Sequence, residues 1–479
     1  MSFPSLDRLS LLENFGHSIG SPAYVYRPTH AEQIAELFEK ASRHGLTVGL
    51  RGSGRSYGDA ALNGGQIVLD ICRMNRILDW NPETGVIKVE PGVTIQQLWQ
   101  YTLEDGYWPP VVPGTMFPTL AGCLAMNIHG KNNCVAGTLG EHVLEFTALL
   151  PNGDTVTCTP ETTPDLFYSI ISGAGLLGVF TSITLRLKRI YSGNLWVHAW
   201  ASPNLRTMIA EFEPLKTEVD YLVGWVDGTV GGSALGRGQV HTAQDLHEGD
   251  DAAPAQSLRV DYQVLPDTFF GLVPKSILWQ FMLPFMNNAG APLVNTGKYL
   301  SSRFLSHHHR FLQSLVAFNF LLDFIPNWEK AYGRGGLIQY QSFVPKETAA
   351  DAFSEIIKLS LRRGLPNYLG VLKRHRPDKF LLTHAVDGFS MAMDYRVTNG
   401  NRVKLQKLCD ELSEIVLQAG GRFYFAKDST IRPEMAARYL GEDTLRRFSE
   451  LKARCDPEGL LQTELYRRLF CSQNGSRES

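Results

Sequence analysis

The feature that most constrains the fold of this chain is a glycine-rich turn at residues 52–58. It carries Gly52, Gly54 and Gly58 and follows an apolar, strand-like run at residues 46–50. Glycine allows the backbone to come close to a ligand and to adopt positive φ angles. Successive N–H groups in such a turn form a concave site for an anion. The turn therefore predicts a binding site for a phosphate or pyrophosphate group.

The elements around this turn argue against a nicotinamide-binding Rossmann unit. A helix is expected first, with Thr29 as N-cap and Glu32 completing a capping box. Its buried face is predicted from apolar residues at helical spacing, namely Ile34, Leu37, Phe38 and Ala41. A second strand, ending at residue 70, then follows the turn. In the Rossmann fingerprint the glycine turn opens directly into a helix.

Two more glycine-rich turns lie beside apolar segments, at residues 113–133 and 171–181. Each offers further backbone donors and room for close approach. Three such turns in one stretch of chain predict a long ligand that is wrapped by backbone.

These motifs resemble the flavin-binding domain of the vanillyl-alcohol oxidase superfamily. The segments that carry the resemblance read RGSGRSYGD, EPGVT, PGT, LAGCLAMNIHGKNN and GAGLLGVFTSITLRL. Within that superfamily, the decaprenylphosphoryl-β-D-ribose oxidases are similar in HGKN at residues 129–132, YGRGGLIQYQ at 332–341, VLKR at 371–374 and GGRFYFAKD at 420–428. The resemblance extends from about residue 20 to residue 469.

The resemblance implies an α+β fold with a two-lobed, PCMH-type FAD-binding domain and a substrate domain built on an antiparallel sheet. The expected divisions are 1–195 for the FAD-binding domain, 196–410 for the substrate domain and 411–479 for a return to the FAD-binding domain. A chain of 479 residues is long enough for two or three lobes.

The implied cofactor is FAD, bound non-covalently. Arg55 stands where many members of the superfamily carry a histidine that bonds to the flavin, and arginine cannot form that bond. The residues expected to bind the cofactor are Arg51, Gly52, Ser53, Gly54, Arg55, Ser56, Tyr57, Gly58, Pro113, Gly114, Thr115, Gly122, Asn127, His129, Gly130, Gly178, Val179 and Tyr424.

The expected catalytic residues are Lys427 and His129. Lys427 follows aromatic residues that would bury its stem, and a cation there can stabilise developing negative charge. The alternative for Lys427 is a structural ion pair with Asp428. His129 is expected to contact the flavin and position groups, or to act as a base; the alternative is an ordinary core histidine.

The substrate is expected to contact Lys131, Gln339, Gln341, Lys373 and Lys427. The two glutamines alternate with apolar residues on a predicted strand, so both face the same side, which suits sugar hydroxyls or a solvated surface. Lys373 with Arg374 could pair a phosphate. Two positions depart from the family: Ala392 replaces a cysteine near the flavin, and Asn133 replaces a frequent histidine.

Composition narrows the function further. The net charge of −2, without a cluster of basic residues, does not favour a nucleic-acid partner. The spacing of the seven cysteines fits neither a disulfide framework nor a metal site. No leader peptide or membrane-spanning run is recognised, so the chain is expected in the cytoplasm, with contact to the inner face of the membrane.

The stretch from residue 269 to 324 is unusually apolar and interrupted by Pro274 and Pro284. It is either a buried pair of core helices or an exposed lip that meets a bilayer or a lipid tail. The family resemblance favours the lip, because the family's substrate is a polyprenyl phosphate.

The combined interpretation is an FAD-dependent oxidation of a sugar's secondary hydroxyl to a ketone. The expected substrate is a polyprenyl-phosphate ribose, which is oxidised at its 2′-hydroxyl. This oxidation would be the first half of an epimerisation in cell-envelope polysaccharide synthesis. A separate NAD(P)H-dependent reductase would complete that epimerisation. One alternative is a soluble aldonolactone or alditol oxidase, whose members usually carry an HGTG-like block in place of HGKN. Another is a non-catalytic flavin- or lipid-binding protein.

Overall fold

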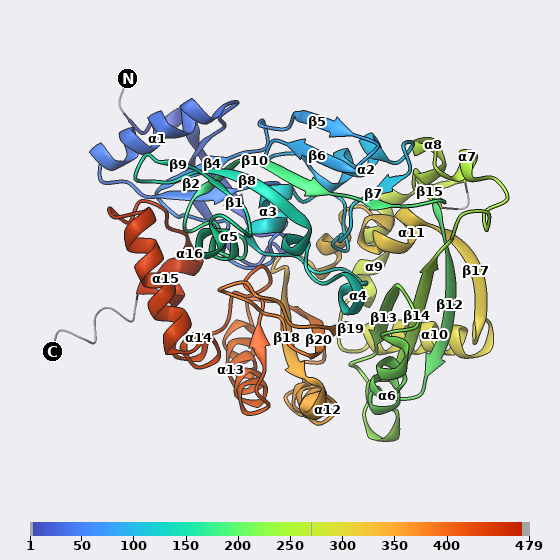
Figure 1. Cartoon of the computed structure of the whole chain (residues 1–479). Coiled ribbons are helices and arrows are strands. Elements are labelled where there is room, and N and C mark those ends of the chain that lie inside the picture. Colours follow the sequence, from blue (N-terminus) through green and yellow to red (C-terminus); the bar gives the residue numbers. More distant parts are fainter. Residues whose placement is uncertain (1–2, 270, 472–479) are drawn as a thin grey trace.

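The computed structural model describes residues 3–269 and 271–471, and its first lobe begins with a mixed four-stranded sheet (Figure 1). The strand order is β1 (Leu9–Glu13), β2 (Gly20–Tyr26), β4 (Ile67–Asp70) and β3 (Val48–Arg51). Helix α1 (Ala31–Arg43) lies between β2 and β3, and its four predicted apolar residues are buried. The predicted capping box is wrong, because the N-cap is His30 and Gln33 accepts the Thr29 N–H at 2.8 Å.

A second, antiparallel sheet completes this lobe. Its strand order is β5 (Ile77–Asn81), β6 (Val86–Val89), β10 (Val179–Arg186), β8 (Val143–Leu149) and β9 (Thr155–Cys158). The connecting elements include α2 (Ile95–Thr102), β7 (Tyr107–Trp108), α3 (Leu120–Ala125), α4 (Asn133–Ala136), α5 (Pro164–Ile170) and β11 (Lys188–Arg189). The two sheets together hold the three glycine-rich turns.

The second lobe is an antiparallel sheet of eight strands. Their order is β17 (His309–Ser314), β12 (Asn194–Ser202), β14 (Gly238–Asp245), β13 (Tyr221–Val226), β19 (Leu369–His375), β20 (Gly388–Arg396), β18 (Leu337–Pro345) and β21 (Arg422–Phe423). The predicted α+β class, with an antiparallel substrate sheet, is confirmed.

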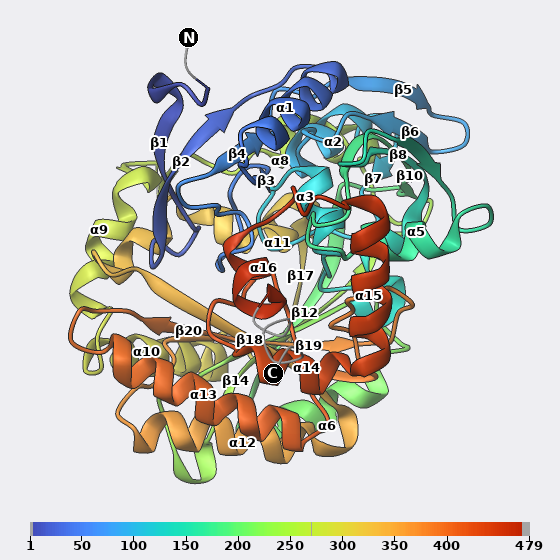
Figure 2. The same cartoon turned by 90° about the vertical axis from the view of Figure 1, so that its left-hand side faces the viewer.

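Helices α6 (Leu205–Leu215), α12 (Lys346–Arg362) and α13 (Arg402–Gln418) cover one face of this sheet, away from the first lobe (Figure 2). At Gly224 on β13, a Cβ atom would lie 2.6 Å from Met208 Sδ on α6, so the two elements are in close contact. The opposite face of the sheet looks toward the first lobe.

The C-terminal helices α14 (Pro433–Leu440), α15 (Glu442–Cys455) and α16 (Glu464–Leu469) return to the first lobe. The Val48 N–H of β3 donates to Leu460 O at 2.8 Å, and Arg468 pairs with Asp59. The large sheet runs from Asn194 to Phe423, so its last strand lies beyond the boundary expected at residue 410. The division into three domains otherwise stays a prediction.

The apolar stretch forms short elements at the edge of the molecule, and Phe270 lies outside the described residues. After α7 (Pro254–Ser257) and α8 (Val260–Gln263) come β15 (Thr268–Phe269), β16 (Val273–Pro274), α9 (Leu278–Met282), α10 (Gly290–Phe304) and α11 (Leu315–Asn319). Leu272 is 85% exposed, Phe281 63% and Phe304 77%. A fully buried helix pair is therefore wrong. The stretch is exposed at these residues, whereas Leu315, Val316, Phe318 and Phe320 near its C-terminal end are buried in the core. Within the described residues, no helix has the length and apolarity to cross a membrane.

Candidate active site

Strand register alone places the candidate residues on one face of the eight-stranded sheet. Directly paired residues share a face of an antiparallel sheet, and so do residues two apart on one strand. Five directly paired positions connect β13, β19, β20 and β18 on this face. They are Trp225–Val371, Val371–Ala392, Lys373–Ser390, Gln341–Ala392 and Gln339–Asp394. This face looks toward the first lobe, so we describe it as the site face.

The glycine-rich turn at residues 52–58 has the backbone that an anion site needs. The N–H groups of Ser53, Gly54, Arg55 and Ser56 donate no hydrogen bond to any other described residue. Gly54 has a φ of +69°. A Cβ at Gly58 would lie 1.8 Å from Asp428 O, so only glycine allows this approach. Four consecutive free donors in a tight turn fit a pyrophosphate group.

The three glycine-rich turns are brought together around helix α3. A Cβ at Gly52 would lie 2.1 Å from Oγ1 of Thr119, the N-cap of α3. At the other end of this helix, Ala174 N–H donates to Ala125 O at 2.9 Å. A Cβ at Gly175 would lie 3.3 Å from Cδ1 of Leu50, near the end of the strand before the first turn. The sequence prediction of a ligand surrounded by several turns is thus consistent with the geometry.

Two side chains of the first turn have buried polar atoms without a partner. Tyr57 is 2% exposed, and its hydroxyl has no hydrogen bond within the described part of the chain; the same holds for Arg55 Nε. The Arg55 guanidinium lies between Phe15 and Phe117, with its Cζ 5.1 and 5.0 Å from the two ring centroids. Buried polar groups normally have partners, so these atoms fit a bound polar group such as a dinucleotide.

Some residues expected to bind the cofactor use their side chains within the protein. Asn127 Nδ2 donates to Thr138 Oγ1 at 2.9 Å, and its Oδ1 accepts the Gly140 N–H at 2.9 Å. Thr115 Oγ1 donates to Asp323 at 2.6 Å. At these positions only the backbone is left for a ligand. The cofactor-binding roles predicted from the sequence, for residues from Arg51 through Gly178 and Val179 to Tyr424, remain predictions.

His129 lies at the centre of the site face, between the two lobes. It is 6% exposed, with Gln341 Nε2 3.0 Å from its Nε2 and Lys373 Nζ 3.5 Å from its Nδ1. Burial, and then the charge of Lys373, hold the pKa of His129 well below its usual range. The imidazole is therefore neutral and offers a nitrogen lone pair rather than a positive charge.

Lys427 is placed beside the first glycine-rich turn by backbone contacts. Tyr57 N–H donates to Ala426 O at 2.9 Å, and Lys427 Nζ lies 3.7 Å from the centroid of the Tyr57 ring. Burial lowers the pKa of Lys427 to about 7. Nζ has no hydrogen-bond acceptor among the described residues. The ion pair with Asp428 is wrong, because Asp428 instead pairs with Arg468 at 2.9 Å.

Lys131 and Lys373 are the other two lysines near His129. The ammonium of Lys131 donates to Phe318 O and lies 4.5 Å from the centroid of the Phe318 ring. Burial lowers the pKa of Lys131 well below its usual range and that of Lys373 to about 8. No carboxylate within the described residues lies within 4 Å of any of the three lysine ammonium groups, those of Lys131, Lys373 and Lys427.

Arg374 does not join Lys373 in a phosphate site. Neighbouring residues on a strand point to opposite faces, so Arg374 lies on the helix-covered face. It is 3% exposed and pairs with Glu213 and Asp387, each at 2.6 Å. The prediction that the two cations act together is wrong.

A buried carboxylate that sequence analysis missed lies next to Gln339. Asp394 is 1% exposed and accepts hydrogen bonds from Gln339 Nε2 at 2.7 Å and from Tyr332 OH at 3.3 Å. Burial raises its pKa to about 6, against the opposing charge of Lys427. Gln339 and Gln341 are both buried, so the solvated-surface alternative for these residues is wrong. An aspartate inside the apolar strand MAMDY was the signal for this residue.

Two further histidines, also missed, surround His129. The ring centroids of His375 and His384 lie 4.8 and 5.5 Å from that of His129. His375 Nε2 lies 2.7 Å from Ser390 Oγ, while Nδ1 of His375 and Nε2 of His384 are buried without a partner in the described residues. Their spacing in the sequence matches no known motif, and only the fold brings them together.

The surroundings of the two positions that depart from the family pattern are well defined. Ala392 lies on the site face opposite Gln341 on β18. Asn133 is buried; it donates to Gly137 O at 2.9 Å and accepts the Arg376 N–H at 3.2 Å. Asn133 therefore fixes the turn after α4.

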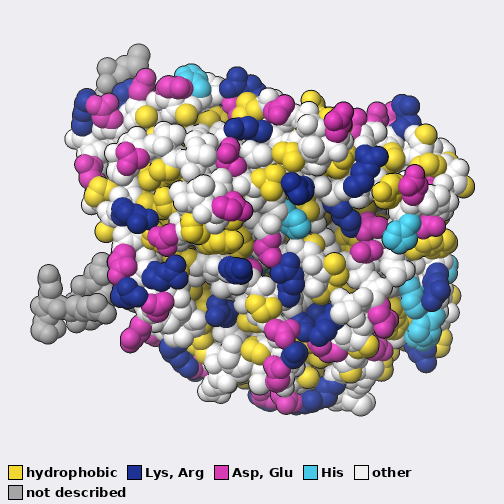
Figure 3. Space-filling model, in the orientation of Figure 1, with side chains coloured by type: hydrophobic (Ala, Val, Ile, Leu, Met, Phe, Trp, Pro, Cys, Tyr) yellow, Lys and Arg dark blue, Asp and Glu magenta, His cyan; other side chains and the backbone are white. Residues whose placement is uncertain are grey.

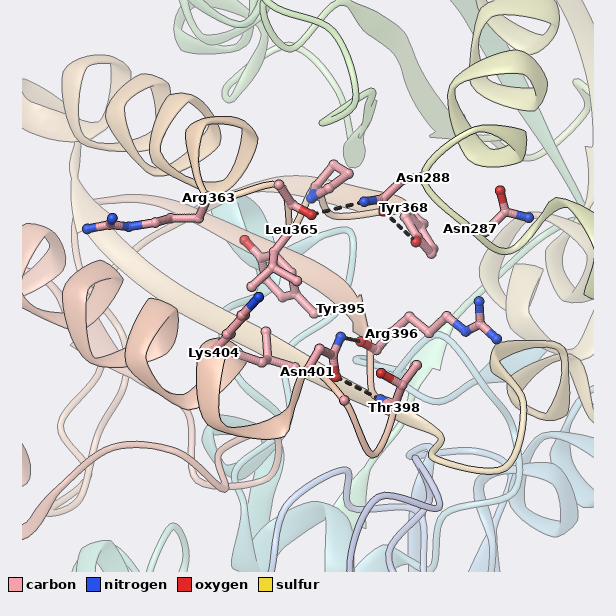
Figure 4. A pocket seen from close by; sticks show the side chains of 14 residues that line it. Asn287, Asn288, Arg363, Leu365, Tyr368, Tyr395, Arg396, Thr398, Asn401 and Lys404 are labelled. Carbon is pink, nitrogen blue, oxygen red and sulfur yellow. Dashed lines mark hydrogen bonds between the residues drawn. The ribbon is translucent and has the colours of Figure 1, made fainter.

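A separate pocket of about 340 Å³ lies at the ends of α12 and α13 (Figure 4). Asn288, Tyr368, Arg396 and Asn401 are among its lining residues. None of the predicted site residues lines it, so it is distinct from the site face.

Comparisons with known proteins agree with this geometry. A family model described as "FAD binding domain" matches residues 22–159. The decaprenylphosphoryl-β-D-ribose oxidase of Mycolicibacterium smegmatis is 30% identical over 96% of this chain and 97% of its own length. The D-arabinono-1,4-lactone oxidase of Yarrowia lipolytica is 23% identical over 43% of this chain and 39% of its own length. A D-lactate dehydrogenase of Anaerostipes hadrus is 28% identical over 35% of this chain and 36% of its own length. The chain belongs to the vanillyl-alcohol oxidase superfamily of FAD-binding oxidoreductases.

Proposed function

We propose that this enzyme oxidises the 2′-hydroxyl of a polyprenyl-phosphate ribose to a ketone, as the first half of an epimerisation. The observation that carries the proposal is the site face, where His129 lies among lysines without carboxylate partners. Uncompensated buried cations are unfavourable in a protein interior, so they favour an anionic ligand. The relative that matches nearly the whole chain is named as an oxidase of such a sugar phosphate.

The residues divide the chemistry between them. FAD, when bound, supplies the acceptor for a hydride from the carbon that carries the hydroxyl. The neutral imidazole of His129 can accept the hydroxyl proton or orient the hydroxyl toward a base. Lys427, protonated below about pH 7, can stabilise the negative charge that develops on the sugar oxygen. Gln339, Gln341 and Lys373 would bind the other sugar oxygens.

The main alternative is oxidation of a soluble aldonolactone or alditol. A relative named as a lactone oxidase supports it, but that relative matches only 43% of the chain. Anaerobic mixing of the FAD-loaded enzyme with a polyprenyl-phosphate ribose should bleach the flavin absorbance. Bleaching by arabinono-1,4-lactone or an alditol instead would support the alternative. Bleaching by none of these compounds would favour a non-catalytic flavin- or lipid-binding protein.

We propose that the exposed apolar stretch contacts a lipid bilayer. Only six residues from 262 to 324 are charged, namely Asp267, Lys275, Lys298, Arg303, Arg310 and Asp323. Figure 3 shows acidic and basic side chains mixed over most of one face of the molecule. At the edge of that face where β17 runs, histidines gather with basic residues. An exposed apolar surface with few charged residues fits the interface of a membrane. A separate NAD(P)H-dependent reductase remains the proposed partner for the keto-sugar.

A further inference from the structure

Helix α10 carries a lysine on a face that is otherwise packed against the protein. Ala291, Asn295 and Ser302 are buried, and their spacing places Lys298 on the same side of the helix. Lys298 is nevertheless solvent-exposed, with its Nζ 4.2 Å from the centroid of the Trp225 ring. Lys298 therefore turns toward the site face of the large sheet.

Trp225 links Lys298 to the active-site residues already described. It lies on β13 opposite Val371, two residues before Lys373 on β19. His241 lies on the same face of β14, since Trp225 pairs with Gln239, two residues before His241. Lys131 lies beside the same strand, since the Leu222 N–H of β13 donates to Lys131 O at 2.8 Å. Lys131, Lys373 and Lys298 thus form a cationic row along this side of the sheet.

Lys131 and Lys298 interact electrostatically with His241. Burial, followed by the charges of Lys131 and Lys298, lowers the pKa of His241 to about 4. Desolvation of the Lys298 ammonium, which lies over the Trp225 ring, lowers its pKa to about 8, although much of the residue is exposed. Neither Lys131 nor Lys298 has a carboxylate within 4 Å in the described part of the chain, and the His241 side chain has no hydrogen bond there.

We propose that Lys131, Lys298 and His241 form a subsite for the phosphate group of the substrate. The two ammonium groups supply charge and the neutral imidazole of His241 supplies a hydrogen bond, a combination that suits a phosphate ester. This inference rests on the proposed function and assigns its phosphate to named residues. Neither Lys298 nor His241 belongs to the set predicted from the sequence.

The outer side of α10 is apolar and belongs to the exposed apolar stretch described above. Leu293, Leu300 and Phe304 are spaced seven and four residues apart, so they share a face, and all three are exposed. The same helix therefore presents a cation inward and apolar side chains outward.

The test measures binding without turnover. Titration calorimetry of the FAD-loaded enzyme would compare farnesyl phosphate, farnesol and inorganic phosphate as probes. Farnesyl phosphate should bind more tightly than farnesol, and inorganic phosphate should compete with it if the free ion also enters the subsite. Lys298→Met should weaken farnesyl phosphate binding about tenfold, as expected for the loss of one charged hydrogen-bond partner. Lys298→Arg should restore the affinity.

Arg303→Met is the matched control, because it removes a positive charge from an exposed position of the same helix. It should leave all three affinities unchanged, and every variant should retain FAD. Equal loss of farnesol and farnesyl phosphate binding in Lys298→Met would overturn the proposal, as would unchanged farnesyl phosphate binding. Flavin bleaching by the sugar substrate tests the oxidation separately, so either proposal can fail alone.

Discussion

Replacing Lys427 is the change that most directly probes the chemistry of the site. Lys427 Nζ lies 3.7 Å from the Tyr57 ring centroid and has no acceptor within the described residues, so its charge is available to a ligand. Removing one preorganised electrostatic group from an active site costs about 10²- to 10³-fold in rate. Lys427→Ala should therefore reduce flavin at about one hundredth of the normal rate or less, while FAD remains bound.

The rate of flavin reduction should depend on pH in a direction set by Lys427. Burial lowers the pKa of Lys427 to about 7, so the ammonium form predominates below pH 7 and is lost as the pH rises through that value. The rate of flavin reduction should fall along with it. Lys427→Arg keeps its charge at all these pH values and should show no such fall, whatever its absolute rate.

The assay is anaerobic stopped-flow spectroscopy of flavin bleaching, at saturating substrate and at several pH values. Lys407→Ala removes an exposed lysine on α13 and serves as the matched control. A rate for Lys427→Ala close to that of the control would refute the catalytic role. Loss of FAD from Lys427→Ala would instead assign the lysine to cofactor binding.

Three further predictions test the cofactor site and the exposed surface. Acid precipitation should release FAD into the supernatant, because Arg55 cannot form a covalent bond to the flavin; flavin retained in the precipitated polypeptide would contradict this. Gly58→Ala should abolish FAD binding, since its Cβ would lie 1.8 Å from a carbonyl oxygen, whereas Gly400→Ala, where a Cβ meets nothing within 4 Å, should bind FAD normally. Changing Leu272 and Phe281 together to Ser should lower co-sedimentation with liposomes at unchanged FAD content; normal co-sedimentation would argue against the lipid-contacting surface.

The elements of the first lobe could be predicted because local sequence determines them. The helical spacing of Ile34, Leu37, Phe38 and Ala41 predicted the buried face of α1, and the glycine-rich turn predicted free backbone donors. The cap at the N-terminal end of α1 was predicted wrongly. Thr29 and Glu32 have the residue types of a capping box, but the Gln33 side chain satisfies the Thr29 N–H instead.

The site could be predicted only where a motif marks it. His129, Lys131 and Lys427 lie in recognisable blocks, and β18 places Gln339 and Gln341 on one side, as their alternation predicts. The pairing of Lys373 with Arg374 failed because adjacent strand residues face opposite ways.

Asp394, His375, His384 and Lys298 could not be found in this way. Asp394 and His375 belong to the site through strand register, His384 through the loop between β19 and β20, and Lys298 through the packing of helix α10. All of these placements depend on tertiary structure. The burial of Asp394 shows that an isolated acidic residue in an apolar strand deserves a functional interpretation.

The central claim is that the enzyme oxidises the 2′-hydroxyl of a polyprenyl-phosphate ribose to a ketone. The most direct measurement is anaerobic flavin bleaching with farnesylphosphoryl ribose that carries deuterium at that carbon, beside the unlabelled compound. The account predicts that the flavin is bleached and that the deuterated compound reacts more slowly. Absence of bleaching, or equal rates for the two compounds in a single-turnover measurement limited by the chemical step, would contradict it.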